Sequence, residues 1–487
     1  MRLAKECKVA IIEKTYDGGV CLPERSANMS LRGKLVVFWM KHRPRHIATT
    51  QMVALMFAAI ILLGALLLTL PAASRDGVSC GLRPALFTAT SATCVTGLVL
   101  YDTWSQWSGF GQVVILCLIQ IGGLGFMSVA TLLIFLLRRK IGLQQRLMIA
   151  QSLSVNDIKG VVRLQKLVLT GSFSVEAVGA IILTLRFWPE YGFTRALRWG
   201  VFHSVSAFCN AGFDIFGAIA PGKSLIEFNA DPVVLLTLSA LIIIGGLGFL
   251  VWENIVQKRS FGKFSVYARM VLLMTAALLA VGWAGTCLLE WNNPETLGGM
   301  TVGEKLLNGF FQSATLRTAG FAAIDQAKLT ESGKAFSCVL MSIGGSSGST
   351  AGGIKTVTFL VLALTIWARA RGKSTVCAFK RTIPDEQTQN AMIIAFIVLA
   401  LAVFGGIFIS ATSPMSFTDA VYEAVSALAT VGLSAGGTAS LSIPAQILII
   451  IYMYFGRVGV LTISLGFLAG DRAEERFRYA ETNLLIG

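Results

Sequence analysis

The pentapeptide Cys94-Val95-Thr96-Gly97-Leu98 recurs three more times along the chain in related forms. The other copies are Cys209-Asn210-Ala211-Gly212-Phe213, Arg317-Thr318-Ala319-Gly320-Phe321 and Ala429-Thr430-Val431-Gly432-Leu433. Their glycines lie 115, 108 and 112 residues apart, and each copy follows a short, half-apolar segment. Four copies at nearly equal spacing indicate that the chain repeats one structural unit four times.

Each predicted unit also contains two apolar segments, most of which reach the roughly 20 residues that a membrane-spanning helix needs. The predicted spans are Gln51–Leu70, Gln112–Leu137, Leu167–Leu185, Pro232–Val256, Met270–Leu289, Phe336–Trp367, Ala391–Ala411 and Ala445–Leu468. Between the two spans of each unit lie the short segments Pro84–Thr93, Leu197–Phe208, Glu304–Thr315 and Phe417–Ala429. These segments are too short to cross a bilayer, so we expect re-entrant helices buried in protein.

The composition excludes a water-soluble enzyme and a disordered scaffold. Of 487 residues, 54% are hydrophobic and only 14% are charged, with a mean hydropathy of +0.70. The net charge of +15 comes from loops on one side of the predicted spans, so it indicates cytosolic loops and not nucleic-acid binding. We therefore expect a multi-pass protein of the cell membrane with both termini in the cytosol and the lipid bilayer as its surroundings.

The predicted organisation is an all-α membrane protein with four helix–pore-helix–helix repeats in a pseudo-fourfold arrangement around a central ion pore. The repeats are assigned to residues 48–147, 148–268, 269–381 and 382–470. A basic cytosolic segment, residues 1–47, precedes them, and a cytosolic tail, residues 471–487, follows them.

The four glycine motifs have a physical rationale as a cation filter. An ion that enters the membrane must have its water replaced, and rings of backbone carbonyls do this for K⁺ in channels. A glycine-bearing strand after each short helix would aim carbonyls at a shared axis. Thr430-Val431-Gly432 matches the first three letters of the TVGYG filter. The predicted ion-binding residues are Cys94, Val95, Thr96, Gly97, Cys209, Asn210, Ala211, Gly212, Arg317, Thr318, Ala319, Gly320, Ala429, Thr430, Val431 and Gly432.

A polar stretch interrupts the sixth apolar span, and it is the candidate gate. The residues are Gly344, Gly345, Ser346, Ser347, Gly348, Ser349, Thr350, Ala351, Gly352 and Gly353. So many glycines disfavour a helix, and unpaired backbone cannot face lipid, so the stretch faces protein or water. It is a mobile plug below the filter or a static kink.

Two cations accompany this stretch in the gating hypothesis. Lys355 is a cation of the pore cavity or a residue at the cytosolic end of the span. Arg457 lies within the last span, where a charge is expensive and indicates function. It projects into the pore, or it pairs with a buried acid such as Glu176.

Other charged residues lie beside the motifs. Asp102, Asp214 and Asp325 follow filter glycines closely, and they give the pore mouth a negative potential or cap loops. Arg317 directly precedes the third Thr-Ala-Gly, where it could tie the short helix to a carboxylate such as Glu423.

The motifs together resemble the filter loops of the Trk/Ktr/HKT superfamily of potassium transporters, and the resemblance runs from about Ala48 onward. The stretch Gly344–Gly353 resembles the intramembrane gating loop of the Ktr type, and the tail Leu484-Leu485-Ile486-Gly487 resembles Ktr-type C-termini. The resemblance implies K⁺ uptake, with K⁺ selectivity where all four filter positions are glycine. It also implies a homodimer, a cytosolic ring of nucleotide-binding regulatory subunits, and Na⁺ as an activator.

Two other classes of function were weighed. A coupled Na⁺/K⁺ or H⁺/K⁺ symporter with alternating access usually has inverted repeats, whereas these four repeats share one topology. A membrane enzyme would need a cluster of catalytic groups, and the sequence shows none. His42, His46 and His203 have no metal-ligand spacing, and no phosphate-binding glycine loop followed by Lys-Ser/Thr occurs. We therefore expect no enzymatic activity and no organic cofactor in this chain.

Overall fold

The computed structural model describes residues 49–125, 131 and 160–459, and these residues are mostly helical. The predicted N-terminal segment and C-terminal tail lie outside them. So do the distal ends of two predicted spans, at residues 126–130, 132–137 and 460–468. The described residues belong to one compact unit, residues 48–487.

The same order of elements occurs four times along the described chain: a long helix, a short helix, a loop with the glycine motif, and a second apolar helix. The first set is α3 (Thr49–Thr69), α4 (Leu82–Thr93) and α6 (Gly109–Leu124), with η1 (Pro71–Ala73) and α5 (Thr103–Gln106) between them. The second set is α9 (Val161–Tyr191), α10 (Phe193–Phe208), η2 (Phe216–Ala218), η3 (Ile226–Phe228), α11 (Pro232–Gly246), α12 (Phe249–Lys258) and η4 (Phe261–Lys263).

The remaining elements follow the same order. The third set is α13 (Val266–Glu290), α14 (Val302–Thr315), η5 (Gln326–Lys328), α15 (Glu331–Ser342) and α16 (Thr356–Ala370). A small antiparallel hairpin of β1 (Cys377–Ala378) and β2 (Arg381–Thr382) leads to the fourth set, which is α17 (Asp385–Thr412), α18 (Phe417–Leu428), η6 (Thr438–Ser440) and α19 (Ile443–Val458). Three of the four short helices begin two to four residues before their predicted starts, and α18 begins at the predicted residue, Phe417.

Local sequence explains where several helices begin. Asp231 accepts hydrogen bonds from the N–H groups of Val233 and Val234, and Pro232 occupies the first helical position of α11. Thr301 and Glu304 form a reciprocal capping box at the start of α14. These caps satisfy backbone N–H groups that have no partner within the first turn of a helix.

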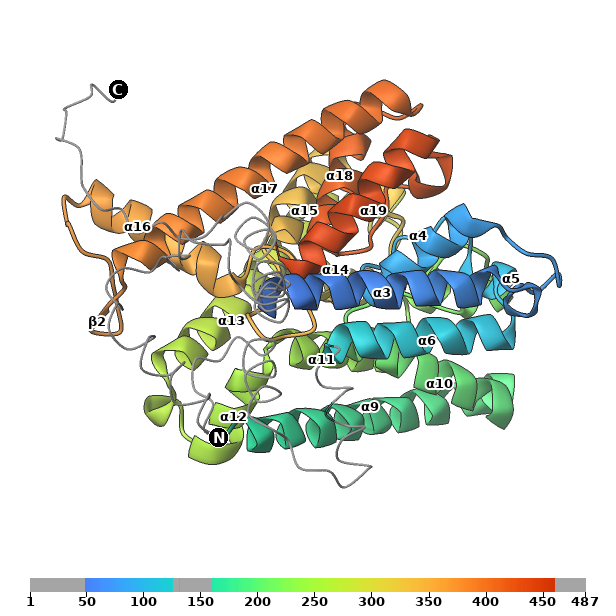
Figure 1. Cartoon of the computed structure of the whole chain (residues 1–487), viewed down its shortest axis with the longest axis horizontal. Helices are drawn as coiled ribbons and strands as arrows, with labels where there is room; N and C mark the ends of the chain where they lie inside the picture. Colours follow the sequence, from blue (N-terminus) through green and yellow to red (C-terminus); the bar gives the residue numbers. More distant parts are fainter. Residues whose placement is uncertain (1–48, 126–130, 132–159, 460–487) are drawn as a thin grey trace, which may run out of the picture. The chain divides into compact units, whose positions relative to one another are not determined.

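Helix packing runs in a closed cycle. Each short helix packs against the long helix before it, in the pairs α3–α4, α9–α10, α13–α14 and α17–α18. Each second helix also packs against the short helix of the following set, in the pairs α6–α10, α11–α14 and α15–α18. The contact of α19 with α4 joins the fourth set back to the first, as Figure 1 shows.

Four described helices, α3, α9, α13 and α17, are long and apolar enough to cross a membrane. The chain is therefore a multi-pass membrane protein, as predicted. The prediction of one continuous span over Pro232–Val256 is wrong, because α11 and α12 meet at an angle of 93°. Gly248, with a φ of +89°, makes this sharp bend possible. The sixth span is interrupted where predicted, between α15 and α16.

Candidate functional site

The four glycine motifs adopt one backbone conformation. The glycines Gly97, Gly212, Gly320 and Gly432 have φ values of +100°, +69°, +82° and +93°. Two residues before each glycine, a residue with a side chain also has positive φ: Val95, Asn210, Thr318 and Thr430. The residue between them has ordinary negative φ, so the sign of φ alternates. The expected strand is therefore wrong: this alternating backbone, which turns successive carbonyls to one side, replaces it.

The four glycines also meet one another. A Cβ added to Gly97 would lie 2.6 Å from the carbonyl oxygen of Ala211, and one added to Gly212 would lie 2.8 Å from that of Ala319. The same holds for Gly320 and the Val431 oxygen, at 2.6 Å, and for Gly432 and the Thr96 oxygen. Each motif thus places a carbonyl where the glycine of the preceding motif lacks a side chain, and the fourth glycine meets the carbonyl of the first motif, which closes the cycle.

Hydroxyl groups on the short helices hold the loops in this conformation. Ser91 and Ser426 each accept a 3.0 Å hydrogen bond from the glycine N–H six residues later. Ser206 and Thr315 instead donate, at 2.7 Å, to the carbonyl that follows the glycine. These four residues were not among the predicted site residues, although Ser91, Ser206 and Ser426 each stand six residues before the glycine.

A second set of buried polar groups supports the chain after the glycine in three of the motifs. His203 Nε2 accepts a hydrogen bond from the Ile215 N–H at 3.2 Å, while Nδ1 lies 2.7 Å from the Trp199 carbonyl oxygen. Gln312 and Gln326 exchange amide hydrogen bonds. Glu423 accepts hydrogen bonds from the hydroxyls of Ser434 and Thr438. His203 is therefore a structural support of the second loop.

Three threonine hydroxyls inside the motifs are buried and have no hydrogen-bond partner in the described chain. They belong to Thr96, Thr318 and Thr430. A buried hydroxyl without a partner is costly unless a ligand satisfies it. Hydroxyl and carbonyl oxygens are the ligand type that hard cations take, so these residues fit a cation as cargo.

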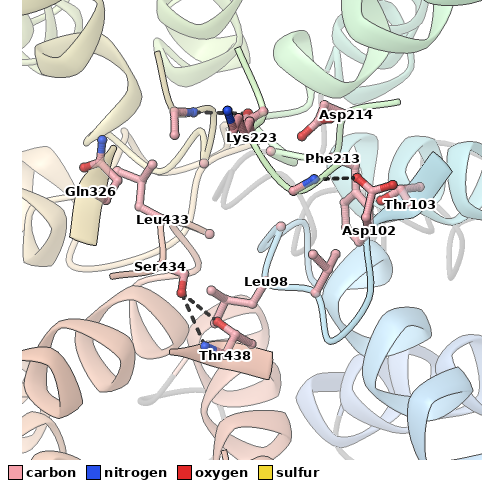
Figure 2. A pocket seen from close by; sticks show the side chains of 18 of the residues that line it. Leu98, Asp102, Thr103, Phe213, Asp214, Lys223, Gln326, Leu433, Ser434 and Thr438 are labelled. Atoms are coloured by element: carbon pink, nitrogen blue, oxygen red, sulfur yellow. Dashed lines mark hydrogen bonds between the residues drawn. The ribbon is translucent and has the colours of Figure 1, made fainter. Parts of the chain in front are cut away.

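Residues that follow the glycines line a cavity of about 300 Å³, which we name the mouth cavity. All four glycines reach it, and Figure 2 shows side chains from four parts of the chain around it, including Leu98, Asp214, Gln326 and Ser434. Its charged lining residues are Asp102, Asp214, Asp325 and Lys223, which leaves an excess of negative charge.

The aspartates of the mouth cavity also act as caps, which is one of their two predicted roles. Asp102 accepts hydrogen bonds from the N–H groups of Ser105 and Gly222. Asp214 accepts one from the N–H of Phe216. Asp214 lies outside the membrane-spanning helices, and burial, followed by the nearby charge of Asp102, raises the pKa of its carboxyl to about 7.

The predicted gating stretch, residues 344–353, is a loop whose ends are joined by the bridge between Ile343 and Ile354. It packs into the bend between α11 and α12. The Ser346 hydroxyl donates to the Leu247 carbonyl, and the N–H of Ser346 donates to the Gly246 carbonyl at 3.1 Å. The N–H of Phe249 donates in turn to the Gly348 carbonyl. The bend frees backbone groups that the loop then satisfies.

The loop also lies against the chain at two of the glycine motifs. The Thr350 hydroxyl donates to the Phe208 carbonyl at 3.2 Å, at the end of α10. A Cβ on Gly352 would collide with the Thr430 hydroxyl. The loop thus touches the second and fourth motifs just before their glycines.

Three buried cations bind carbonyls of this loop. Arg457 donates to the carbonyls of Thr350, Gly122 and Gly123. Lys355 Nζ donates to the Ala351 carbonyl at 2.8 Å. Arg317 donates to the carbonyls of Gly344 and Thr275 at 3.4 Å. No carboxylate pairs with any of the three among the described residues.

Two predicted ion pairs are therefore wrong. Arg317 does not reach Glu423, because its guanidinium turns toward the gating loop while Glu423 binds Ser434 and Thr438. Arg457 does not pair with Glu176, whose carboxylate accepts hydrogen bonds from Gln120 and from the Cys209 thiol instead. Of the predicted filter residues, Cys94, Cys209 and Ala429 cap the C-terminal ends of the short helices.

The four glycine motifs thus meet in a multi-pass membrane protein, beside a cavity with an excess of negative charge and an internal loop whose carbonyls bind three cations. The sequence model of the TrkH family, described as cation transport protein, matches residues 27–475. The chain belongs to this family, and the resemblance found in its motifs is confirmed.

Relatives of known name agree with this family. The chain is 38% identical to the potassium/sodium uptake protein NtpJ of Enterococcus hirae, over 92% of this chain and 99% of that protein. It is 37% identical to the Ktr system potassium uptake protein B of Bacillus subtilis, over 92% and 98%. The crystal structure of the potassium transporter TrkH from Vibrio parahaemolyticus superposes with a TM-score of 0.67, at 18% identity, over 88% and 86%.

Proposed function

We propose that this protein takes up potassium ions across the cell membrane through a channel-like pore. Four glycine loops would form its selectivity filter in pseudo-fourfold order around one axis. The observation that carries the proposal is the closed cycle in which each filter glycine abuts the carbonyl of the next motif. Relatives with potassium uptake in their names support K⁺ as the cargo.

The chemistry of the filter follows from its backbone. The alternating sign of φ makes carbonyls available as ion ligands, and the orphaned hydroxyls of Thr96, Thr318 and Thr430 add further oxygens. The short helices end at the motifs, so the partial negative charges of their C-termini also favour a cation there.

The loop of residues 344–353 is the gate in this proposal. It lies against the second and fourth filter motifs, and three cations hold its carbonyls. Arg457 and Lys355 would repel K⁺ and would also keep the loop in place. Withdrawal of the loop would remove the barrier and change the positions of these charges.

The assembly is also part of the proposal. We assign repeats to residues 48–147, 148–268, 269–381 and 382–470, with both termini in the cytosol. The B. subtilis relative is named as part of a Ktr system, which supports a homodimer that binds a cytosolic ring of nucleotide-binding regulatory subunits. Na⁺ is proposed as an activator, in line with the potassium/sodium name of the E. hirae relative.

The test is flux into proteoliposomes that contain the purified protein. Rb⁺ uptake driven by a K⁺ gradient alone is expected for a channel-like pore. An absolute requirement for a Na⁺ or H⁺ gradient would instead support a coupled symporter with alternating access. Gly97→Ser should reduce discrimination of K⁺ over Na⁺, because its Cβ and hydroxyl would press on the Ala211 carbonyl. Unchanged selectivity would contradict the filter assignment.

A further inference from the structure

A buried carboxyl group behind the second filter loop has no part in the function proposed so far. Glu176 lies in the middle of the membrane-spanning helix α9 and is 4% exposed. Gln120 Nε2 donates to both its oxygens, at 3.0 and 3.1 Å. No cation pairs with Glu176 within the described part of the chain. Burial of an ionisable acid inside a membrane costs free energy, so an acid at this position indicates a role in function.

The carboxyl group lies directly behind Cys209, three residues before Gly212. The Cys209 Sγ atom is 4.0 Å from Glu176 Oε1 and 3.8 Å from Gln120 Oε1. Ser204, on the same short helix as Cys209, donates a 2.6 Å hydrogen bond to the backbone carbonyl of Glu176. The second filter loop is therefore attached to α9 at the position of this acid.

Arg457 is connected to the same cysteine through Gly123 on α6. A Cβ on Gly123 would lie 2.5 Å from Cys209 Sγ, and the Gly123 carbonyl accepts a 3.1 Å hydrogen bond from Arg457 Nη2. Cys209 thus contacts both the Glu176 carboxyl group and the backbone of α6 that binds Arg457, whereas Glu176 and Arg457 do not touch each other.

A counter-charge is needed at this place. Arg317, Lys355 and Arg457 put three positive charges beside the gating loop, and each is held by carbonyls alone. In a region of low dielectric constant, uncompensated positive charge lowers the occupancy of a nearby cation site. A carboxylate that contacts Cys209, directly behind the second filter loop, offsets part of that repulsion.

We propose that Glu176 is a counter-charge to Arg457 that sets the affinity of the pore for K⁺ at the second filter loop. The inference rests on the proposed function, because it assigns Glu176 a role in that same pore. Glu176 is a positioning and electrostatic residue, and it does not itself touch the ion.

The test separates the effect of the charge of Glu176 from the effect of its side-chain shape. Glu176→Gln keeps the shape and removes the charge, so the KM for Rb⁺ uptake should rise about fivefold with little change in the maximal rate. The double variant Glu176→Gln with Gln120→Glu exchanges the two hydrogen-bonding partners and keeps one carboxylate in the pair. It should restore the KM to within about twofold of the wild-type value.

Glu253→Gln is the matched control, because Glu253 accepts a 2.8 Å hydrogen bond from Gln257 on α12, in an exposed setting. Its KM should be unchanged. Should Glu176→Gln not fold, judged by size-exclusion chromatography, the exchanged pair decides: a wild-type KM supports the counter-charge, and a raised KM overturns it. An unchanged KM in folded Glu176→Gln also overturns it.

The proposed function is tested separately in the same vesicles. If wild-type protein and Glu176→Gln both fail to prefer Rb⁺ to Na⁺, the filter assignment fails. If the wild-type protein is selective and Glu176→Gln has the wild-type KM, only the role of Glu176 fails.

Discussion

The filter motifs and the gating loop are both glycine-rich, but they are held in different ways. Each filter loop is fixed by hydrogen bonds within its own set of helices, such as Ser91 to Gly97 and Ser426 to Gly432. The proposed gating loop is bound nearby by Lys355 and Arg317, and it is also bound by residues 80 to 142 positions away in sequence, namely Tyr267, Arg457 and Phe208.

This difference has a mechanical meaning. Local bonds hold the filter loops whatever the distant helices do, because they break only when a short helix itself unfolds. The bonds of the gating loop join separate helices and break when those helices move apart. The comparison predicts that changes in the filter alter selectivity, whereas changes in the gating loop alter flux with selectivity preserved.

The largest effect is expected from a filter glycine. In Gly432→Ala, the new Cβ would collide with the Thr96 carbonyl at a φ of +93°, which side chains disfavour. K⁺-selective Rb⁺ uptake should fall at least about a hundredfold in proteoliposomes. Gly77→Ala is the control, because Gly77 also has positive φ, at +68°, but has open space at its Cβ position. Equal losses in the two variants would show that backbone strain alone is responsible.

The next effect should come from removal of the gate. Deletion of Ser346–Thr350 removes the contacts with Leu247, Phe208 and Arg457. Rb⁺ flux without any regulatory partner should rise about tenfold, and the ratio of K⁺ to Na⁺ permeability should stay the same. Thr365→Val, which removes a local hydroxyl bond within α16, is the control. Lost selectivity in the deletion would refute the separation of filter and gate.

A smaller effect is expected from the hydroxyls behind the filter. Ser426→Ala leaves the Gly432 N–H without its partner, which costs about 1 kcal/mol and should lower K⁺ over Na⁺ selectivity about fivefold. Ser313→Ala, on another short helix, removes a bond to the Leu279 carbonyl in α13 and should leave selectivity unchanged. Competition of Na⁺ against Rb⁺ uptake measures both. A loss of flux at constant selectivity would contradict the assigned role.

The smallest effect should appear at the mouth cavity. The pKa of Asp214 is raised to about 7, first by burial and then by Asp102. Its carboxyl is therefore mostly ionised at pH 8 and mostly protonated at pH 6, so acid removes a negative charge from the cavity. The KM for Rb⁺ should rise about twofold from pH 8 to pH 6. In Asp214→Asn the KM should not change over this range; a persistent pH dependence would assign it to another group.

Much of this architecture was predictable from sequence, because membrane spans and re-entrant helices differ in length. The short helices, the interruption between α15 and α16, and the glycines of the motifs all follow from apolar length and spacing. The bend at Gly248 was missed because the apolar run of α11 continues across it into the first turn of α12. Only the structure shows that Ser346 from a distant segment binds the carbonyls exposed by the bend.

Side-chain pairing was harder to predict than the backbone. The predicted carboxylate partners of Arg317 and Arg457 rested on the assumption that a buried cation needs an acid. In the structure, carbonyls of the gating loop accept hydrogen bonds from both arginines instead. The serines at fixed distance before the glycines were visible in the sequence. Their role depends on how the chain turns back after the short helix, which spacing alone does not reveal.

The glycine cycle also restricts how such a protein can diverge. Because each glycine leaves room for a carbonyl supplied by the neighbouring motif, a side chain introduced in one quarter damages the adjacent quarter as well. After a tandem duplication, the four copies could therefore differ freely in their outer helices. The four glycine positions, however, could change only together. Engineering of altered ion preference should accordingly redesign adjacent motifs in pairs.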